Sequence, residues 1–287
     1  MSRFRMGLAV WGFKGWEGDF MPRGVRQQDM LRMFAMRMTC VEGNDVFYGV
    51  PSAAVLQKRV ALTPPGFQFC PKFPRAISHE GLLGPKVDDA LRFLRHMRDN
   101  LGDRLGPVFL QLPPAYSPAE GPDLARLLNA WRREGGHPLL VEVRHDAWYR
   151  TPPQERLDTM LARMGMGRVV LDTRPIYSGD DDPQSENPRK KPRLPLHAVA
   201  IGPIAMVRYI SHPDTARNEP FLRAWAHQIH DWLDEGKTVY FFVHCPYEEH
   251  SPKHARVLQR MLEERGAPVP PLPWDSLPPE PQQSALF

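Results

Sequence analysis

Charged and amide side chains recur at one place in the sequence pattern, namely the end of short apolar runs. They interrupt the segments VEGN, CPK, LQL, VEVRH, LDT, VRY and FVH, which are otherwise mostly apolar. Burying an ionisable side chain without a partner is costly, so a merely structural core would not carry one at nearly every run. The repeated placement therefore indicates a shared polar site.

The cationic and amide members of this set predict recognition of a small anion. Two arginines and a lysine, together with amide side chains, suit a carboxylate or a phosphate group. The ligand-binding residues predicted on this basis are Trp11, Glu42, Asn44, Lys72, Gln111, Arg144 and Arg208. His145, next to Arg144, is expected to point outward or along the rim of the site.

Three further residues are predicted as catalytic. Glu142 and Asp172 fall on adjacent predicted strands as acid and base, and His244 would titrate near neutral pH. A metal site built from Glu42 and these three residues is disfavoured, because the nearby cationic side chains oppose a bound cation. No P-loop, nucleophile elbow, HExxH or dinucleotide fingerprint is present, so the sequence identifies no cofactor.

A structural alternative explains the same residues without a ligand. Lys72, Arg144 and Arg208 could neutralise the acids Glu42, Glu142 and Asp172 in a buried network that only closes the top of the fold. In that case the polar ring would stabilise the core and bind nothing.

Eight short apolar runs must position these side chains, and stretches of helical periodicity lie between most of them. The predicted strands are Met6–Trp11, Thr39–Asn44, Phe67–Lys72, Pro107–Leu112, Pro138–Val143, Arg168–Asp172, Ala205–Ile210 and Thr238–His244. The clearest predicted helices are Gln27–Arg37, Lys86–Asn100, Asp123–Arg133, Pro153–Met164, Arg217–Asp234 and Lys253–Glu264. Alternation around eight strands, without a dinucleotide turn, predicts a (β/α)8 TIM barrel, whose chemistry lies at the C-terminal strand ends.

Two stretches break this alternation. The segment Arg174–Leu196 holds acids and then the basic run RKKPR, and it predicts a long loop at the rim that is either a mobile lid or a solvated insertion. The segment 267–287 is rich in proline and predicts an extended or disordered tail after a barrel domain spanning 1–266.

Within this tail, QSALF resembles the short motif that docks bacterial repair and replication proteins on the DNA sliding clamp. Gln283, Leu286 and Phe287 are its predicted partner-binding residues.

Composition places the chain among cytoplasmic globular proteins. Its 287 residues suffice for one barrel, and its 42% hydrophobic content is too low for a membrane protein. No secretory signal or membrane-spanning run is recognised, so no membrane partner is expected. Three isolated cysteines argue against disulfides and a zinc site, and the net charge of +4 permits an anionic partner without requiring one.

Seven segments together resemble the YecE-like family, known as a domain of unknown function with a TIM-barrel fold. They are WGFKGWEGDFMP, VEGNDVFYGVP, TPPGFQFCPKFPRAISH, GPVFLQLPP, VEVRHDAWY, VVLDTRP and KKPRLPLHAV. The resemblance implies the barrel and adds His145 to the ligand-binding residues, but it implies no activity. The last two strands, with Arg208–Tyr209 and His244–Cys245, depart from the commoner family pattern and are similar to a proteobacterial-type subgroup.

Three functions remain open at this point. The first is an enzyme or binder for a small anionic, phosphorylated or sugar-like ligand, which the charged ring favours. The second is a barrel associated with DNA repair or replication, tethered to the sliding clamp by QSALF; direct nucleic-acid binding has no motif to support it. The third is a non-catalytic ligand-binding module.

Overall fold

Eight parallel strands form the centre of the molecule in a computed structural model that describes residues 3–185 and 190–277. The strands are β1 Phe4–Leu8, β2 Cys40–Gly43, β3 Gln68–Pro71, β4 Val108–Gln111, β5 Leu139–Glu142, β6 Gly167–Asp172, β7 Ile204–Ile210 and β8 Thr238–His244. They pair in the order β3-β2-β1-β8-β7-β6-β5-β4, and the bridges Phe69↔Leu105 and Lys72↔Phe109 join the two outermost strands. The structure confirms the predicted TIM barrel.

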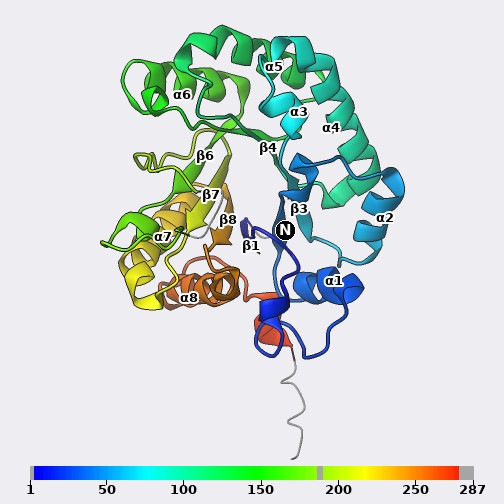
Figure 1. Cartoon of the computed structure of the whole chain (residues 1–287), viewed down its shortest axis with the longest axis vertical. Helices are drawn as coiled ribbons and strands as arrows, with labels where there is room; N and C mark the ends of the chain where they lie inside the picture. The colour runs from blue at the N-terminus through cyan, green and yellow to red at the C-terminus, as the bar shows by residue number, and fades with distance from the viewer. Residues whose placement is uncertain (1–2, 186–189, 278–287) are drawn as a thin grey trace, which may run out of the picture.

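The helices form an outer ring around these strands (Figure 1). They are α1 Met30–Ala35, α2 Ala53–Ala61, α3 Arg75–Ser78, α4 Val87–Leu101, α5 Gly121–Arg133, α6 Pro153–Met164, α7 Thr215–Asp234 and α8 Ser251–Glu264. Sequence patterning missed α2 and α3. The reason for α2 is that it buries Leu56 but leaves most of its other side chains exposed or half-buried, so it has no strong apolar periodicity.

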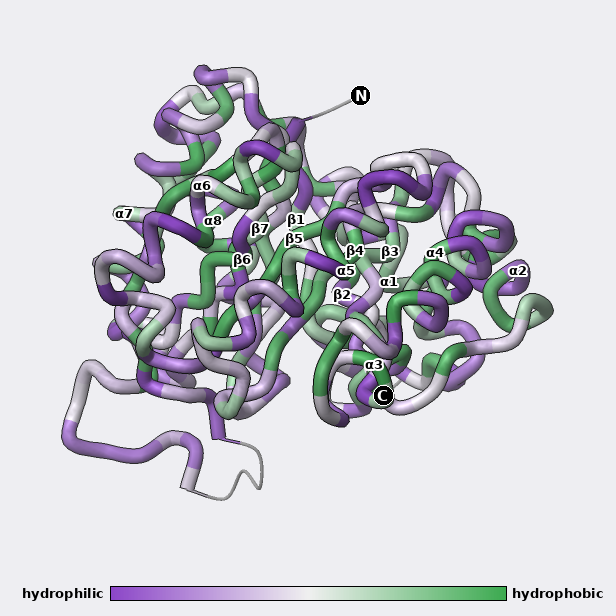
Figure 2. The backbone as a smooth tube through the Cα atoms, turned by 90° about the horizontal axis from the view of Figure 1, so that it is seen from above, coloured by the Kyte–Doolittle hydropathy of each residue, from purple (hydrophilic) through white to green (hydrophobic). Residues whose placement is uncertain are grey.

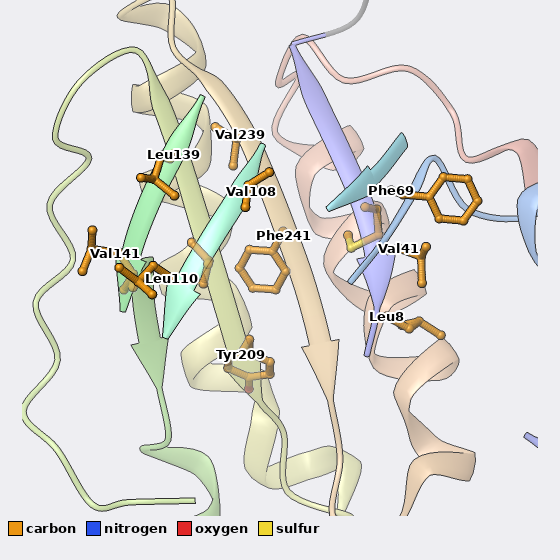
Figure 3. Close-up of a cluster of buried hydrophobic side chains, with 14 of the residues drawn as sticks. Leu8, Val41, Phe69, Val108, Leu110, Leu139, Val141, Tyr209, Val239 and Phe241 are labelled. Carbon is orange, nitrogen blue, oxygen red and sulfur yellow. The ribbon is translucent and has the colours of Figure 1, made fainter. Parts of the chain in front are cut away.

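Two apolar layers follow from the alternation of side chains along each strand. Outward-facing residues such as Val41, Leu110 and Phe241 belong to one large apolar cluster with buried residues of the helices. Figure 3 shows strand residues of this cluster. Inward-facing residues fill the lower part of the barrel; they are Cys40, Cys70, Phe109, Leu140, Val169, Met206, Tyr240 and Phe242. Hydrophilic segments concentrate on the outer helices and connecting loops (Figure 2). The next inward positions, two residues further along several strands, are the polar ones.

The predicted boundary of the barrel at residue 266 is wrong, because the first half of the proline-rich segment packs on the barrel. Leu272 is buried, and the Trp274 ring lies edge-on to Phe20 with centroids 4.8 Å apart. Arg256 on α8 pairs with Asp275 at 2.6 Å and lies 4.3 Å from the Trp274 ring centroid. The prolines allow only a short 3-10 helix, Pro273–Ser276, but they do not prevent burial of apolar side chains. Gln283, Leu286 and Phe287 lie outside the described residues.

No helix in the described ranges is long and apolar enough to cross a membrane.

Candidate functional site

A cavity of about 670 Å³ lies at the C-terminal ends of the strands. The sequence-predicted residues that line it are Asn44, Lys72, Gln111, Arg144, Arg208 and His244. They come from β2, β3, β4, β5, β7 and β8 or the residue or two after them, so the barrel brings together side chains that are far apart in sequence. The sequence predicted a shared polar site at the strand ends, and these six side chains meet there.

Arg208 joins two buried glutamates at the base of the cavity. Its Nε and Nη2 donate to the two oxygens of Glu42 at 2.8 and 2.6 Å, and its Nη1 donates to Glu142 Oε2 at 2.6 Å. Both glutamates are fully buried. Burial opposes their ionisation, but the charge of Arg208 together with the charges and hydrogen bonds of neighbouring basic groups outweighs it, so the pKa of Glu142 falls to about 2 and that of Glu42 falls well below its usual value. Both carboxylates are therefore ionised at neutral pH.

Three neighbours complete the hydrogen bonding of these carboxylates. Arg144 Nε donates to Glu142 Oε1 at 2.7 Å, and Asn44 Nδ2 donates to Glu42 Oε1 at 2.6 Å. His244 Nε2 lies 2.9 Å from Glu42 Oε2. Burial lowers the pKa of His244 to about 4 despite the adjacent carboxylate, so the ring is neutral at pH 7. A neutral ring must donate from Nε2 to the carboxylate, which leaves Nδ1 as an acceptor.

Lys72 lies beside this network but does not pair with its carboxylates. Its Nζ donates to Gln111 Oε1 at 2.9 Å and lies 3.9 Å from the centroid of the Phe47 ring. Burial is the main cause that lowers the pKa of Lys72 to about 7; the charges of Arg208 and Arg144 also lower it, whereas those of Glu142 and Glu42 raise it. The amine is therefore partly neutral at pH 7.

The sequence did not predict several residues that line the same cavity. They are Arg75 and His79 on and after α3, Gln184, Lys190 and Lys191 from the loop after β6, and Glu248 after β8. The run RKKPR was the only signal for any of them. Burial is the main cause of two shifts: it lowers the pKa of Lys191 to about 8 and raises that of Glu248 to about 8. Glu248 is consequently protonated at neutral pH.

The prediction that Asp172 converges on this site is wrong. Its carboxylate accepts hydrogen bonds from the Arg174 backbone and guanidinium at 2.9–3.0 Å and from Trp225 Nε1 on α7 at 2.7 Å. The inward-facing residues of β6 are Val169 and Leu171. Because side chains alternate along a strand, Asp172 faces outward, and its hydrogen bond to Trp225 holds α7 against the outside of the barrel.

Two predicted ligand-binding residues also lie away from the main cavity. His145 Nδ1 accepts a hydrogen bond from the backbone N–H of Ala147 at 3.1 Å and thereby caps a short 3-10 helix. Trp11 lies beyond the end of β1 and lines a smaller neighbouring cavity of about 240 Å³, where its ring meets Phe69 edge-on. In the described residues, no group of three or more His, Cys, Asp or Glu side chains is arranged to hold a metal ion.

Comparisons with known proteins agree with this architecture. Residues 5–281 match the family described as "Protein of unknown function DUF72". The chain is 32% identical to the UPF0759 protein YecE of Escherichia coli K12 over 289 aligned residues, which cover 98% of this chain and 99% of that protein.

Two solved structures share the fold. The DUF72 family protein EF0366 of Enterococcus faecalis V583 superposes with a TM-score of 0.67 at 14% identity, over 91% of this chain and 97% of that one. The DUF72 family protein TM1631 of Thermotoga maritima MSB8 gives a TM-score of 0.66 at 17% identity, over 91% and 99%. At these identities the likeness extends to the fold alone.

Proposed function

The chain belongs to the DUF72 family of proteins of unknown function, and we propose that its barrel cavity binds a small anionic molecule bearing a phosphate or carboxylate, such as a phosphorylated sugar derivative. The excess of positive charge around the cavity carries this proposal. The cationic lining residues are Lys72, Arg75, Arg144, Lys190, Lys191 and Arg208. Among the described lining residues Glu248 is the only acid, and its raised pKa of about 8 keeps it protonated at neutral pH.

Neighbouring acids cancel part of this charge, because Asp182 pairs with Lys190 at 2.6 Å and the two buried glutamates balance two of the arginines. Glu42 and Glu142 pair with Arg208 and Arg144 beneath the cavity, two acids against two bases. Within residues 3–185 and 190–277, the acids beside the cavity pair with Arg144, Arg208, His244 and Lys190, and none forms an ion pair with the Lys191 or Lys72 amine. Both amines are therefore placed to contact an anionic ligand.

The dimensions of the cavity support a small molecule. Its volume of about 670 Å³ falls in the usual range of roughly 300–1,000 Å³ for small-ligand sites. Its position at the C-terminal strand ends is where ligands bind in this fold. A nucleic-acid duplex would instead need an extended basic face, which this enclosed arrangement does not supply.

An enzyme is supported better than a passive binding module, because uncharged groups able to transfer protons line the cavity. His244 is neutral at pH 7 with Nδ1 unused by Glu42, and Glu248 holds a proton. Glu142 is a poor general base, since Arg208 and Arg144 occupy its oxygens and hold its pKa near 2. Its role in this proposal is to position the two arginines.

Replacing Lys191 with glutamine should weaken binding of phosphate-bearing ligands by about tenfold or more, as expected for loss of a charge-assisted contact. Calorimetric titration with sugar phosphates and the matching unphosphorylated sugars measures this. The control is Lys58→Gln, which removes the same charge from an exposed position on α2. Equal binding by both variants, or no preference for the phosphorylated compounds, would contradict the proposed site.

A second proposal concerns a partner of the C-terminal segment. We propose that Gln283, Leu286 and Phe287 dock on a bacterial DNA sliding clamp, the Leu–Phe pair filling an apolar pocket and the glutamine bonding at its rim. Leu272 and Trp274 pack on the barrel, so the segment that could link the barrel to a clamp begins after them. That link is shorter than the whole proline-rich segment 267–287.

A peptide ending PEPQQSALF should bind the clamp with micromolar affinity, and changing Leu286 and Phe287 to alanine should abolish binding. Fluorescence titration measures both peptides. No binding of the unaltered peptide at millimolar concentration would remove this partner and leave the anion site as the sole proposal.

A further inference from the structure

Lys72 has an environment unlike that of the other cations at the strand ends. It follows β3, its side chain is only 8% exposed, and its amine opens on the cavity. Arg144 and Arg208 each pair with a glutamate, whereas the Nζ of Lys72 contacts a neutral amide oxygen and the face of the Phe47 ring. Among the described residues, no acid compensates this amine within ion-pair distance.

The Phe47 ring favours the ammonium form of Lys72, whereas burial and the neighbouring guanidinium groups favour the neutral amine and outweigh the ring. Burial removes water from the charged form, and Arg208 and Arg144 repel it. The pKa of about 7 means that about half of the Lys72 amines are neutral at pH 7. For an ordinary lysine of pKa about 10.4 that fraction is about a thousandfold smaller. A neutral amine in an enclosed site has an available electron pair and is a nucleophile toward carbonyl carbon.

Lys191 also has a lowered pKa and lines the same cavity, but the two lysine amines differ in how firmly they are held in place. Lys72 directly follows β3 and is bridged to Phe109 of β4, and its amine is oriented by Gln111, whose amide lies 3.3 Å from His79 Nε2. Lys191 belongs to the loop after β6, and within the described part of the chain no side-chain hydrogen bond orients its amine. A reactive group needs a fixed approach to the reacting carbon, which Lys72 has and Lys191 lacks.

We propose that Lys72 forms a Schiff base with an aldehyde or ketone group of the bound anion, so that the ligand is a phosphorylated or carboxylated carbonyl compound. This inference rests on the proposed anion site and names its substrate class. The nitrogen electron pair forms a C–N bond as the C=O π pair moves to oxygen. One proton passes from nitrogen to oxygen to give a carbinolamine, whose hydroxyl and remaining N–H proton then leave together as water. Loss of water then leaves the C=N bond, so amine and carbonyl become imine and water without an oxidant or reductant.

Borohydride trapping tests this on the full chain. Dihydroxyacetone phosphate is the probe, dihydroxyacetone is its uncharged counterpart, and sodium borohydride reduces any imine to a stable secondary amine. We expect an adduct with the phosphate, mapped by peptide mass spectrometry to Lys72 in at least about tenfold preference over surface lysines such as Lys58. Inorganic phosphate should compete with the labelling, and labelling should rise with pH through about 7, as the Lys72 amine loses its proton.

Matched variants distinguish an adduct on Lys72 from labelling of other lysines and from loss of anion binding. Lys72→Arg keeps the charge and Lys72→Met keeps the length; both should abolish the adduct at that position, while Lys58→Gln should leave it unchanged. Circular dichroism and calorimetric binding of the phosphate probe show whether each variant is folded and keeps the anion site. Labelling on Lys191 or spread over surface lysines overturns the inference. Probe binding without an adduct overturns the inference alone, whereas absence of binding and adduct together overturns the proposed anion site as well.

Discussion

Replacing Arg208 with methionine should lower the free energy of unfolding by about 3–5 kcal/mol at pH 7, as expected when a buried ion pair loses one partner. The guanidinium is 2% exposed and donates to both fully buried glutamates. Methionine fills a similar volume but leaves the charges of Glu42 and Glu142 without their shared partner. Urea denaturation at pH 7, followed by circular dichroism, measures the loss.

The same variant has a diagnostic pH dependence. In the parent protein the lowered pKa values of Glu42 and Glu142 give stability that is present above about pH 4.5 and is lost as pH falls toward 2. Without Arg208 these carboxyls protonate more readily, so the difference between variant and parent should shrink below pH 4.5. Adding Glu42→Gln and Glu142→Gln to Arg208→Met should recover part of the loss at pH 7. A loss below about 1 kcal/mol, or no recovery in the triple variant, would contradict the buried network.

Acidification from pH 6.5 to 4 should reveal a second large effect, because two buried histidines remain neutral in the folded state. Burial is the main cause that lowers the pKa of His244 and of His254 to about 4 each. His254 is fully buried and its Nδ1 lies 2.8 Å from Ser211 Oγ. Between pH 6.5 and 4 the unfolded chain binds protons that the folded chain does not, so stability falls as pH falls. Each histidine should contribute about 1.4 kcal/mol per pH unit, or about 3 kcal/mol over the interval.

Comparing the parent protein with variants that lack one histidine isolates the contribution of that histidine to the pH dependence of stability. Glu248, whose pKa is raised to about 8, keeps its proton when folded and opposes the trend, since its effect makes stability rise as pH falls from 8 to 4.5. The informative quantity is therefore the difference between the parent and His254→Gln or His244→Gln. Each glutamine variant should show a shallower acid slope in urea midpoints. Parallel slopes in parent and variants would show that neither histidine is held neutral by the fold.

The polar residues at the strand ends can be predicted from the sequence where each lies two positions after an inward-facing residue of the same strand. Glu42 follows Cys40, Gln111 follows Phe109, and Arg208 follows Met206, each pair with both members facing inward. The error at Asp172 has the same physical basis. Its place at the end of an apolar run predicts that Asp172 faces the site, whereas the alternation set by Val169 places it outward. Packing across the barrel decides which side chains of a strand face inward; the residue type at the strand end does not.

The remaining site residues depend on tertiary contacts that no local pattern encodes. Lys191 reaches the cavity because its backbone N–H binds Gln184, whose side chain is held by the Tyr177 hydroxyl. Glu248 is held because Trp16, far away in sequence, donates to its carbonyl at 2.9 Å. The sequence could place RKKPR at the rim, but not which lysine enters the cavity.

An anomalous difference map at the selenium edge, from crystals soaked in selenate, shows whether the barrel cavity binds anions. We expect a selenate peak inside the cavity, contacting the side chains of Arg144 and Lys191. Selenate bound solely at the outer surface, with water alone between these side chains, would contradict it.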